Sequence, residues 1–567
     1  MFQDKATIIA QKLTRFNQGA EERDAQRRAA RDGKPYLNLI TAPVEIDALQ
    51  IISEEKAKKM KIAAINLVNK DLVVAVFDLK TEGLEEEFLE LRKMGYDLDF
   101  FIVSLSGLKH AWSYYVYVAR EGGEITRRFF VSKEKIEEFK KNVSTIKYLR
   151  ERIKNIDFNH TEVSEFLSII AAGALALKAS DIHFEPVREG VGIRLRLDGV
   201  LNEVIGGRGE ALIEKEFYNQ VASRIKLFSG LKLNITDETQ DGRFTINLGG
   251  EEVEARVAIA PAEFGEVMVM RILDPAAISL KLSDLGFSEN DLKIIKGQLS
   301  KPNGMILNTG PTGSGKTTTL YAFLREVVST EIKIITIEDP IEYHLEGLEQ
   351  TQVNPEANYT FAGGLRSILR QDPDVVLVGE IRDEDTAAIA INASLTGHLV
   401  FSTLHTNDAA GAVPRLLDLK VKTGVIGSAL NLVIAQRLVR KLCQFCKKEA
   451  QVNHELEKKI KKVVASLPEK IEREKYAEMK IFESSEKTKD CEKCNGTGYK
   501  GRLGIFELFV IDDKVQRMIE GKNSILDIKQ MAREQGMITM QEDGVLKVLK
   551  GITSLEEIER ATGVLQI

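Results

Sequence analysis

The chain has 567 residues, of which 43% are hydrophobic and 29% charged, and its formal net charge is −6. This length predicts about three to five domains, and this composition excludes wholesale disorder and a fibrous repeat. The 85 acidic residues outnumber the 79 basic ones, so no global positive field is present to hold nucleic acid non-specifically.

Two apolar stretches of the chain fail the requirements for a membrane span. Polar side chains interrupt the uncharged stretch 386–407, and the run 166–177 is too short. The first 16 residues lack an uninterrupted apolar core followed by a small-residue cleavage site, which argues against secretion. Four cysteines are too few for a disulfide scaffold in a chain of this length. We therefore expect a cytoplasmic protein without a transmembrane helix.

The first part of the chain predicts an arm, a small domain and a linker. Residues 1–34 carry apolar residues at helical spacing and predict an N-terminal helical arm. Residues 35–140 predict a small α+β domain with helices at 47–60 and 84–94 and two strands within 62–79. Residues 141–160 are highly charged and predict a partly helical linker.

The pattern then changes twice. Residues 161–278 predict a second α+β domain, with a helix ending near Lys178 and alternating strand patterns at 193–200 and 266–273. From residue 279 to the end, helical stretches separate short apolar runs at 305–308, 332–337, 375–378 and 399–404. Runs that are apolar at consecutive positions are typical of a parallel sheet with helices on both faces, so this part predicts an α/β domain.

A glycine-rich loop follows the first of these runs. Residues 310–317 match the phosphate-binding pattern between a predicted strand and a predicted helix, a context that disfavours a chance match. Backbone N–H groups of such a loop converge on phosphate oxygens, Lys316 places a charge on the outer phosphates, and the Thr317 hydroxyl suits Mg²⁺. The predicted nucleotide-binding residues are Gly310, Pro311, Thr312, Gly313, Ser314, Gly315, Lys316, Thr317 and Thr318.

Reactive side chains follow the other apolar runs. Because ligands in open parallel sheets bind beyond the carboxyl ends of the strands, these residues outline a nucleotide-hydrolysis site. They are Glu338 and Glu342, Glu380, and His405, with His398 just before the last run. Gly379 stands where a magnesium-binding Asp is expected, which leaves Glu380 for the metal. Spacing alone does not rank Glu338, Glu342 and Glu380 as the carboxylate that activates water.

All four cysteines lie in two C-x-x-C pairs. Cys443 with Cys446, and Cys491 with Cys494, can present four thiolates to a structural Zn²⁺. Redox catalysis is the alternative, but it would not need two pairs. The charged residues 447–490 between the pairs predict two solvated helices, and the whole zinc-binding segment is expected at 441–502.

Together these motifs resemble those of the secretion ATPases that power type II secretion and type IV pilus assembly. The resemblance rests on residues 310–317, 336–343, 365–383 and 396–408, with 179–186 and 194–200 upstream, and it extends from about residue 160 to the C-terminus. It implies a RecA-like P-loop ATPase domain at 279–567 with a zinc-binding tetracysteine insert. A PAS-like α+β domain is implied at 161–278.

The resemblance also implies roles for single residues. Lys316 and Thr317 match the phosphate and Mg²⁺ ligands, and Glu342 matches the general base. Glu380 matches the glutamate of the atypical second acidic motif, which we expect to contribute to Mg²⁺ binding. His398 and His405 match the family's histidine box, with His405 as a sensor of the terminal phosphate.

Arg256 and Arg271 match the family's charge-stabilising arginines. An arginine in a mostly apolar strand needs an anionic partner, which a phosphate supplies when two domains close. A structural ion pair, for instance with Glu254 or Asp274, is the alternative. Arg194 and Arg196 share a strand face and rank lower.

The resemblance implies a homohexamer that hydrolyses ATP to assemble pilin or pseudopilin subunits through an inner-membrane platform protein. It places the ring in the cytoplasm, peripherally at the inner face of the cytoplasmic membrane, with the N-terminal domain available to a membrane-recruitment protein. The alternative hypothesis is a non-hydrolysing adaptor that uses nucleotide only to assemble. It is suggested by Gly379, which stands where a magnesium-binding Asp is expected. A nucleic-acid translocase is disfavoured by the acidic balance and by the lack of an aromatic and basic stripe, so we expect no nucleic-acid partner.

Overall fold

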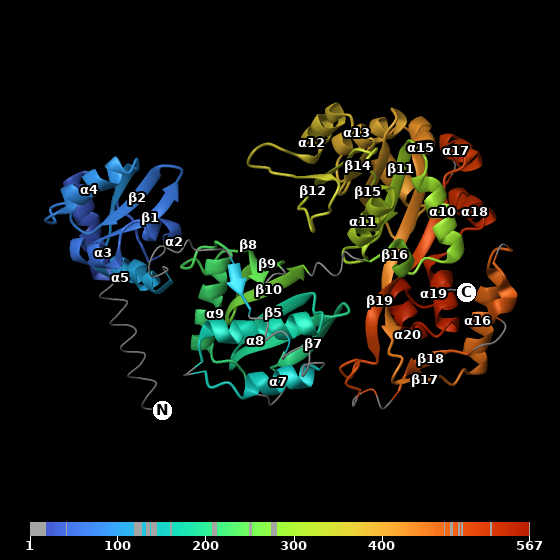
Figure 1. The fold of residues 1–567 in the computed structure, drawn as a ribbon, viewed down its shortest axis with the longest axis horizontal. Helices are drawn as coiled ribbons and strands as arrows, with labels where there is room; N and C mark the ends of the chain where they lie inside the picture. The colour runs from blue at the N-terminus through green and yellow to red at the C-terminus, as the bar shows by residue number, and fades with distance from the viewer. Residues whose placement is uncertain are drawn as a thin grey trace. The chain divides into compact units, whose positions relative to one another are not determined.

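A computed structural model describes most of the chain as two compact units, residues 1–272 and 273–567 (Figure 1). The described residues are 19–40, 42, 44–117, 128–131, 137, 145–158, 161–206, 212–248, 252–273, 280–469, 471–476, 480–485, 488, 491–521 and 524–565. Much of the predicted arm 1–34 therefore lies outside the described residues. So does Asp274, one of the two acidic residues named as a possible ion-pair partner of the candidate arginines.

The N-terminal unit begins with a helix at residues 19–32 and a three-stranded sheet in the order β1-β2-β3. The elements are α2 (Ile46–Leu49), α3 (Glu54–Met60), β1 (Ile62–Val68), β2 (Asp71–Val76), α4 (Leu84–Lys93), β3 (Asp97–Ile102), α5 (Leu105–Ser113) and η1 (Tyr114–Tyr117). The single helix predicted at 47–60 is wrong, because Ser53 starts a new one. Its side chain accepts a hydrogen bond from the N–H of Lys56, as a helix N-cap does.

The second part of this unit is a seven-stranded sheet in the order β4-β8-β9-β10-β5-β6-β7. Its elements are β4 (Arg128–Phe130), α7 (Ile146–Lys154), α8 (Val163–Ala176), β5 (Asp181–Val187), β6 (Gly190–Leu197), β7 (Val200–Ile205), α9 (Lys215–Phe228), β8 (Gln240–Asn247), β9 (Glu252–Ala262) and β10 (Gly265–Leu273). Alternate residues of the strands point into one core together with apolar residues of α8 and α9. The charged residues of the strands therefore occupy the opposite face of the sheet.

The C-terminal unit contains the parallel sheet that the apolar runs predict. Its strand order is β13-β12-β14-β15-β11-β16-β19, in which all neighbours are parallel except β16 and β19. The strands are β11 (Gly304–Thr309), β12 (Ile334–Glu338), β13 (Glu349–Gln352), β14 (Val375–Val378), β15 (Leu399–Leu404), β16 (Leu430–Leu442) and β19 (Tyr499–Val510).

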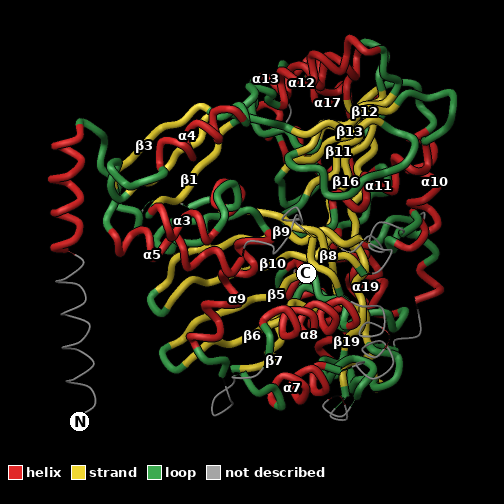
Figure 2. The backbone as a smooth tube through the Cα atoms, turned by 60° about the vertical axis from the view of Figure 1, so that its left-hand side comes forward, coloured by secondary structure: helices red, strands yellow, loops and turns green. Residues whose placement is uncertain are grey.

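Helices cover both faces of this sheet (Figure 2). The helical elements are η3 (Leu282–Asp284), α10 (Glu289–Leu299), α11 (Lys316–Val327), α12 (Phe361–Ile368), η4 (Leu369–Gln371), α13 (Glu384–Leu395), α14 (Ala412–Asp418), α15 (Thr423–Ala429), α17 (Asp513–Glu520), α18 (Ile525–Glu534), α19 (Met540–Leu549) and α20 (Leu555–Thr562). Consecutive strand residues enter different cores: Met305 and Leu307 pack with α12 and α13, whereas Ile306 packs with α10 and α11. The predicted α/β class is confirmed.

The segment between the cysteine pairs differs from its prediction. Its described residues form β17 (Lys447–Glu449), α16 (His454–Ser466), η5 (Arg473–Tyr476) and β18 (Phe482–Ser484), with β17 antiparallel to β18. The expected pair of solvated helices is therefore wrong for this part of the chain. The α-helix α16 is also not fully solvated, because it buries Ile460 and Val463 in a core shared with the main sheet. Among all described residues, no helix is long and apolar enough to cross a membrane.

Candidate nucleotide-binding site

The glycine-rich loop connects the buried strand β11 to α11, whose first residue is Lys316. Gly315 precedes this helix with a φ of 88°, a left-handed conformation that favours glycine. At Gly310, a Cβ atom would lie 2.5 Å from the backbone oxygen of Gln436, so a side chain does not fit. The Lys316 Nζ donates hydrogen bonds to the carbonyl oxygens of Gly310 (2.8 Å) and Pro311 (3.2 Å), and thus curls over the loop.

Two of the three candidate carboxylates, Glu342 and Glu380, lie close enough to Lys316 to affect its pKa. Burial lowers the pKa of Lys316 and Arg437 lowers it further, while Glu380 and Glu342 act in the opposite direction. The phosphate loop and the two acidic strand ends are therefore brought together at the carboxyl edge of the sheet, as the topology of parallel strands requires.

Glu338, the last residue of β12, is 3% exposed and fully engaged. One carboxylate oxygen accepts hydrogen bonds from Thr336 Oγ1 (2.6 Å) and Gln350 Nε2 (3.2 Å), and the other accepts one from the Tyr321 hydroxyl. A carboxylate occupied in this way is poorly suited to take a proton from water. Among the three candidate carboxylates, this geometry favours Glu342 and Glu380 over Glu338.

Glu380 lies beyond β14 and contacts two basic side chains. Its Oε2 is 3.4 Å from the Nε2 of His405, and its Oε1 accepts a hydrogen bond from Arg382. Arg382 also lies 3.7 Å from Asp339 of the acidic box. Gly379, just before Glu380, donates its N–H to the Ile337 carbonyl at 2.8 Å, so its backbone is hydrogen-bonded to the neighbouring strand β12.

His398 is not brought to these residues. It precedes β15, whereas His405 follows it, and the strand between them spans residues 399–404. Because a strand rises roughly 3.3 Å per residue, the two histidines lie beyond opposite ends of β15. The Nδ1 of His398 lies 3.0 Å from the carbonyl oxygen of Ala393, at the end of α13.

Two polar residues of β16 complete the site, and the sequence analysis did not identify either. Gln436 is 2% exposed, and its Oε1 accepts hydrogen bonds from Asn308 (2.8 Å) on β11 and Thr319 (2.9 Å) on α11. Arg437 donates to Asn407 at 3.3 Å, next to the histidine box. The signal was available, since polar side chains interrupt an apolar central strand.

The two candidate arginines belong to the N-terminal unit. Arg271 Nε donates to Asp181 Oδ1 at 3.0 Å, and Arg196 Nε lies 3.1 Å from the other oxygen of Asp181. Burial raises the pKa of Asp181, but hydrogen bonds from Arg271 and Ser180 outweigh it, so the net shift is downward. The Arg271 side chain is still 61% exposed, which leaves it accessible to a further anion.

Arg256 Nε lies 3.6 Å from Glu254 Oε1, the ion pair that the sequence analysis named as the alternative. Arg194 pairs with Glu185. All of these charged residues lie on the face of the seven-stranded sheet opposite α8 and α9.

The four cysteines converge as their spacing predicts. The sulfur atoms all lie within 4.8 Å of one another, and those of Cys443 and Cys491 are 3.9 Å apart. Cys446 and Cys494 are 3.7 Å apart. A tetrahedron with Zn–S bonds of about 2.3 Å has edges of about 3.8 Å, whereas a disulfide would need about 2.0 Å. The donor set therefore fits zinc.

A family model described as "Type II/IV secretion system protein" matches residues 158–560. The chain belongs to this family. A type II secretion system protein E of Pseudomonas aeruginosa PAO1 is 44% identical over 400 residues, which cover 70% of this chain and 75% of that protein. The type IV pilus assembly ATPase PilB of Myxococcus xanthus is 34% identical over 533 residues, covering 93% of this chain and 88% of that protein.

Solved structures show the same fold as this secretion-family chain. The ATPase DotB of Yersinia pseudotuberculosis aligns with a TM-score of 0.52 at 19% identity, over 73% of this chain and 96% of that structure. The family model and the curated relatives confirm the resemblance to the secretion ATPases that the motifs indicated.

Proposed function

We propose that this chain hydrolyses ATP to drive the assembly of pilin or pseudopilin subunits through an inner-membrane platform protein. The convergence of Lys316, Glu342, Glu380 and His405 at one edge of the sheet carries the enzymatic part of the proposal. The relatives named as type IV pilus assembly and type II secretion proteins support the biological part.

Each residue then has a distinct role in hydrolysis. The loop amides and Lys316 bind the outer phosphates. Thr317 and Glu380 would supply oxygen ligands for Mg²⁺, and the bound ion would neutralise developing charge on the phosphates. Glu342 accepts the proton of the attacking water, and His405, next to Glu380, responds to the terminal phosphate. His398 lies at the opposite end of β15 from His405, so we do not assign it to this site.

The family also supports a proposal for assembly and location. The proposal includes a homohexameric ring in the cytoplasm, held peripherally at the inner face of the cytoplasmic membrane by its partners. The N-terminal α+β domain, residues 35–140, is the proposed contact for a membrane-recruitment protein. Arg256 and Arg271 are proposed to stabilise phosphate charge when the domain that carries them closes on the nucleotide.

The second candidate function is a non-hydrolysing adaptor, which the glycine at position 379 favours because it removes the usual magnesium-binding Asp. Steady-state phosphate release separates the two functions. We expect turnover by the natural chain and none by Lys316→Ala or Glu342→Gln, while Glu342→Gln still binds ATP because Lys316 and the loop amides remain.

Glu346→Gln is the matched control, because Glu346 is an exposed glutamate in the connection between β12 and β13, and the variant should retain turnover. Absence of phosphate release from the natural chain would favour the adaptor. Near-normal hydrolysis by Glu342→Gln would instead move the general-base role to Glu380.

We further propose that Cys443, Cys446, Cys491 and Cys494 hold one structural Zn²⁺ per chain. Structural zinc supplies folding energy, so Cys491→Ser should lower the zinc content and loosen residues 441–502. Elemental analysis of protein purified without chelator checks this. A zinc content near zero, together with four titratable thiols, would contradict the assignment.

A further inference from the structure

The edge strand β13 carries two glutamines that hold the acidic-box loop, residues 339–345, from one side. Gln350 and Gln352 are two residues apart and therefore share one face of the strand. Both side chains form hydrogen bonds with the loop, although neither glutamine belongs to a motif that the sequence analysis used.

Gln350 makes three hydrogen bonds with its single amide group. Its Nε2 donates to Glu338 Oε1 (3.2 Å) and to the carbonyl oxygen of Tyr343 (3.0 Å), and its Oε1 accepts from the N–H of Leu345 (2.8 Å). One side chain thus ties the buried end of β12 to two backbone groups of the loop.

Gln352 adds a bond on the other side of Glu342. Its Oε1 accepts from the N–H of Ile341 at 3.3 Å. The backbone is therefore held at residue 341 and at residue 343, immediately before and immediately after Glu342.

The strand that carries both glutamines is itself fixed to β12. The two strands pair in parallel register from Ile335 with Glu349 to Glu338 with Gln352. The N–H of Val353 donates to the Glu338 carbonyl (2.9 Å), and Thr351 Oγ1 donates to the Thr336 carbonyl (2.8 Å). Tyr321, on the helix that begins at Lys316, donates to the same Glu338 carboxylate. Phosphate loop, β12 and acidic-box loop thus share one hydrogen-bonded framework.

We propose that Gln350 is a positioning residue that, with help from Gln352, holds the Glu342 carboxylate in place for hydrolysis. This inference rests on the proposed function of the site. Gln350 does not contact the nucleotide in this role; it acts through the backbone on either side of Glu342.

A positioning role has a specific kinetic consequence. Displacing a catalytic group by about 1 Å can lower a rate by about 100-fold without changing ground-state binding. Gln350→Met keeps the length of the side chain but removes all three hydrogen bonds. We expect it to lower kcat by about 10- to 100-fold, with the KM and Kd for ATP unchanged.

Glu349→Gln is the matched control, because Glu349 lies on the opposite face of β13, where its side chain is 59% exposed and lies 3.8 Å from Lys333 Nζ. This variant should keep the natural kcat. Thermal unfolding of all variants separates a loss of fold from a loss of rate, and rates are compared per folded molecule.

A double-mutant cycle with Glu342→Gln, measured by single-turnover phosphate release at excess protein, gives a readout that a merely structural role would not move. If Gln350 acts through Glu342, then Gln350→Met should have no further effect once Glu342 is changed. Additive losses would overturn the proposal, as would an unchanged kcat or a change in KM alone. If the natural chain itself releases no phosphate, the proposed function fails and this inference with it. If the natural chain is active and Gln350→Met has the same kcat, only the positioning role is overturned.

Discussion

Glu507 is a buried carboxyl group that contacts the loop after β15. It is 5% exposed, and one of its oxygens accepts a hydrogen bond from the N–H of Ala409 at 2.9 Å. Burial, with a smaller contribution from the nearby Asp408, raises the pKa of Glu507 to about 7, although the Ala409 N–H and Lys529 oppose the shift. The loop that follows His405 therefore rests on a group that titrates near neutral pH.

The raised pKa predicts how stability depends on pH. The folded state keeps a proton on Glu507 that the unfolded chain loses above its ordinary pKa of 4.5, so this group's contribution falls as pH rises from 4.5 through about 7. Glu507→Gln removes the ionisation but keeps an acceptor for Ala409. We expect the melting temperature of the variant, relative to the natural chain, to be distinctly higher at pH 8 than at pH 5. A difference that is the same at both pH values would contradict this prediction.

At the scale of residues, the sequence predicts the side chains that would bind ligands directly. It does not predict the residues that position those side chains. Lys316 and the cysteines could be predicted because phosphate and zinc binding impose a local spacing. The polar interruption at Gln436 is visible in the sequence, but its partner is not, because Asn308 lies 128 positions away. Gln350 belongs to the same class, since its role depends on a loop that folds back over its strand.

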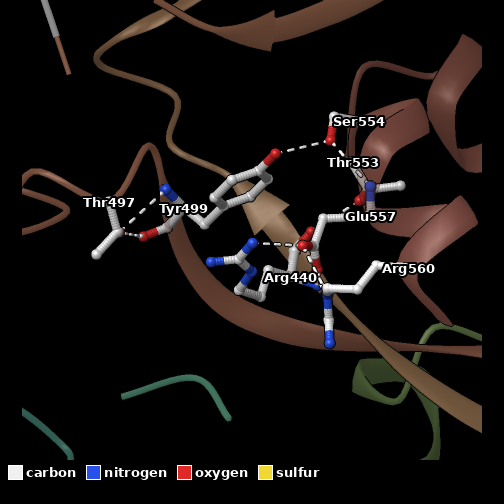
Figure 3. Close-up of polar contacts among 7 residues, drawn as sticks. All are labelled: Arg440, Thr497, Tyr499, Thr553, Ser554, Glu557 and Arg560. Carbon is white, nitrogen blue, oxygen red and sulfur yellow. Dashed lines mark hydrogen bonds and ion pairs between the residues drawn. The ribbon is translucent and has the colours of Figure 1, made fainter. Parts of the chain in front are cut away.

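At the scale of secondary-structure elements, polar contacts around α20 connect the cysteine-bearing segment to the main sheet (Figure 3). Glu557 on α20 accepts a hydrogen bond from the Arg440 N–H (3.0 Å) and pairs with the guanidinium groups of Arg440 and Arg560. The Arg440 guanidinium lies 4.1 Å from the ring centroid of Tyr499, whose hydroxyl is 2.8 Å from Ser554 Oγ. Arg440 lies on β16, which ends just before the first cysteine pair, and Tyr499 begins β19, just after the second pair. This network therefore joins the two halves of the four-cysteine cluster.

The Glu557 network predicts a loss of stability with a defined pH window. Burial raises the pKa of Glu557, but hydrogen bonds from Arg560 and Arg440 outweigh it and hold the pKa at about 2. The stabilisation is therefore present above the ordinary pKa of 4.5 and is lost as pH falls through about 2. Because Glu557 is buried, Glu557→Gln should cost about 2 to 4 kcal/mol at pH 7, reduced from the upper limit because Arg560 is half exposed.

Urea unfolding at pH 7 measures this loss, and hydrogen exchange should locate it in α20 and the strands around Arg440. Glu556→Gln, on the exposed side of the same helix, is the control and should change stability little. Equal effects of the two substitutions would show that the network does not stabilise the helix.

The secondary-structure predictions succeed and fail for the same physical reason. Buried parallel strands such as β14 and β15 are continuous apolar runs and could be read directly. β13 has the sequence Glu-Gln-Thr-Gln and, among the strands that the structure describes, pairs with β12 alone, so it carries no hydrophobic pattern to detect. β4, with three residues, pairs with a strand more than a hundred residues later, and no local pattern encodes that partner.

For the whole molecule, the pattern of apolar runs and the phosphate loop predicted the fold class, because both are encoded locally along the chain. Our proposal adds a coupling between the two units, which no local sequence pattern encodes. Arg271 belongs to the N-terminal unit and the phosphate loop to the C-terminal unit, so in our proposal they act together only when a nucleotide draws the units closed. Hydrolysis should therefore depend on Arg271 far more than ATP binding does.

Arg271→Ala tests this dependence. Removing a charge-stabilising arginine lowers phosphoryl-transfer rates by about 10³ or more while sparing ground-state binding. We expect the variant to bind ATP, to form hexamers and to hydrolyse poorly. Mixed with natural chains, it should depress activity by more than its fraction, because a motor ring needs successive subunits to turn over.

Arg196→Ala is the matched control, because Arg196 binds the same Asp181 carboxylate at 3.1 Å. If Arg271 only neutralises Asp181, the two substitutions should behave alike: each lowers the melting temperature and leaves the rate per folded molecule intact. If Arg271 instead stabilises the transferring phosphate, both variants lose some stability, but only Arg271→Ala loses turnover. Turnover and thermal unfolding measured on the same preparations distinguish these outcomes, and a destabilised but fully active Arg271→Ala would refute the catalytic role.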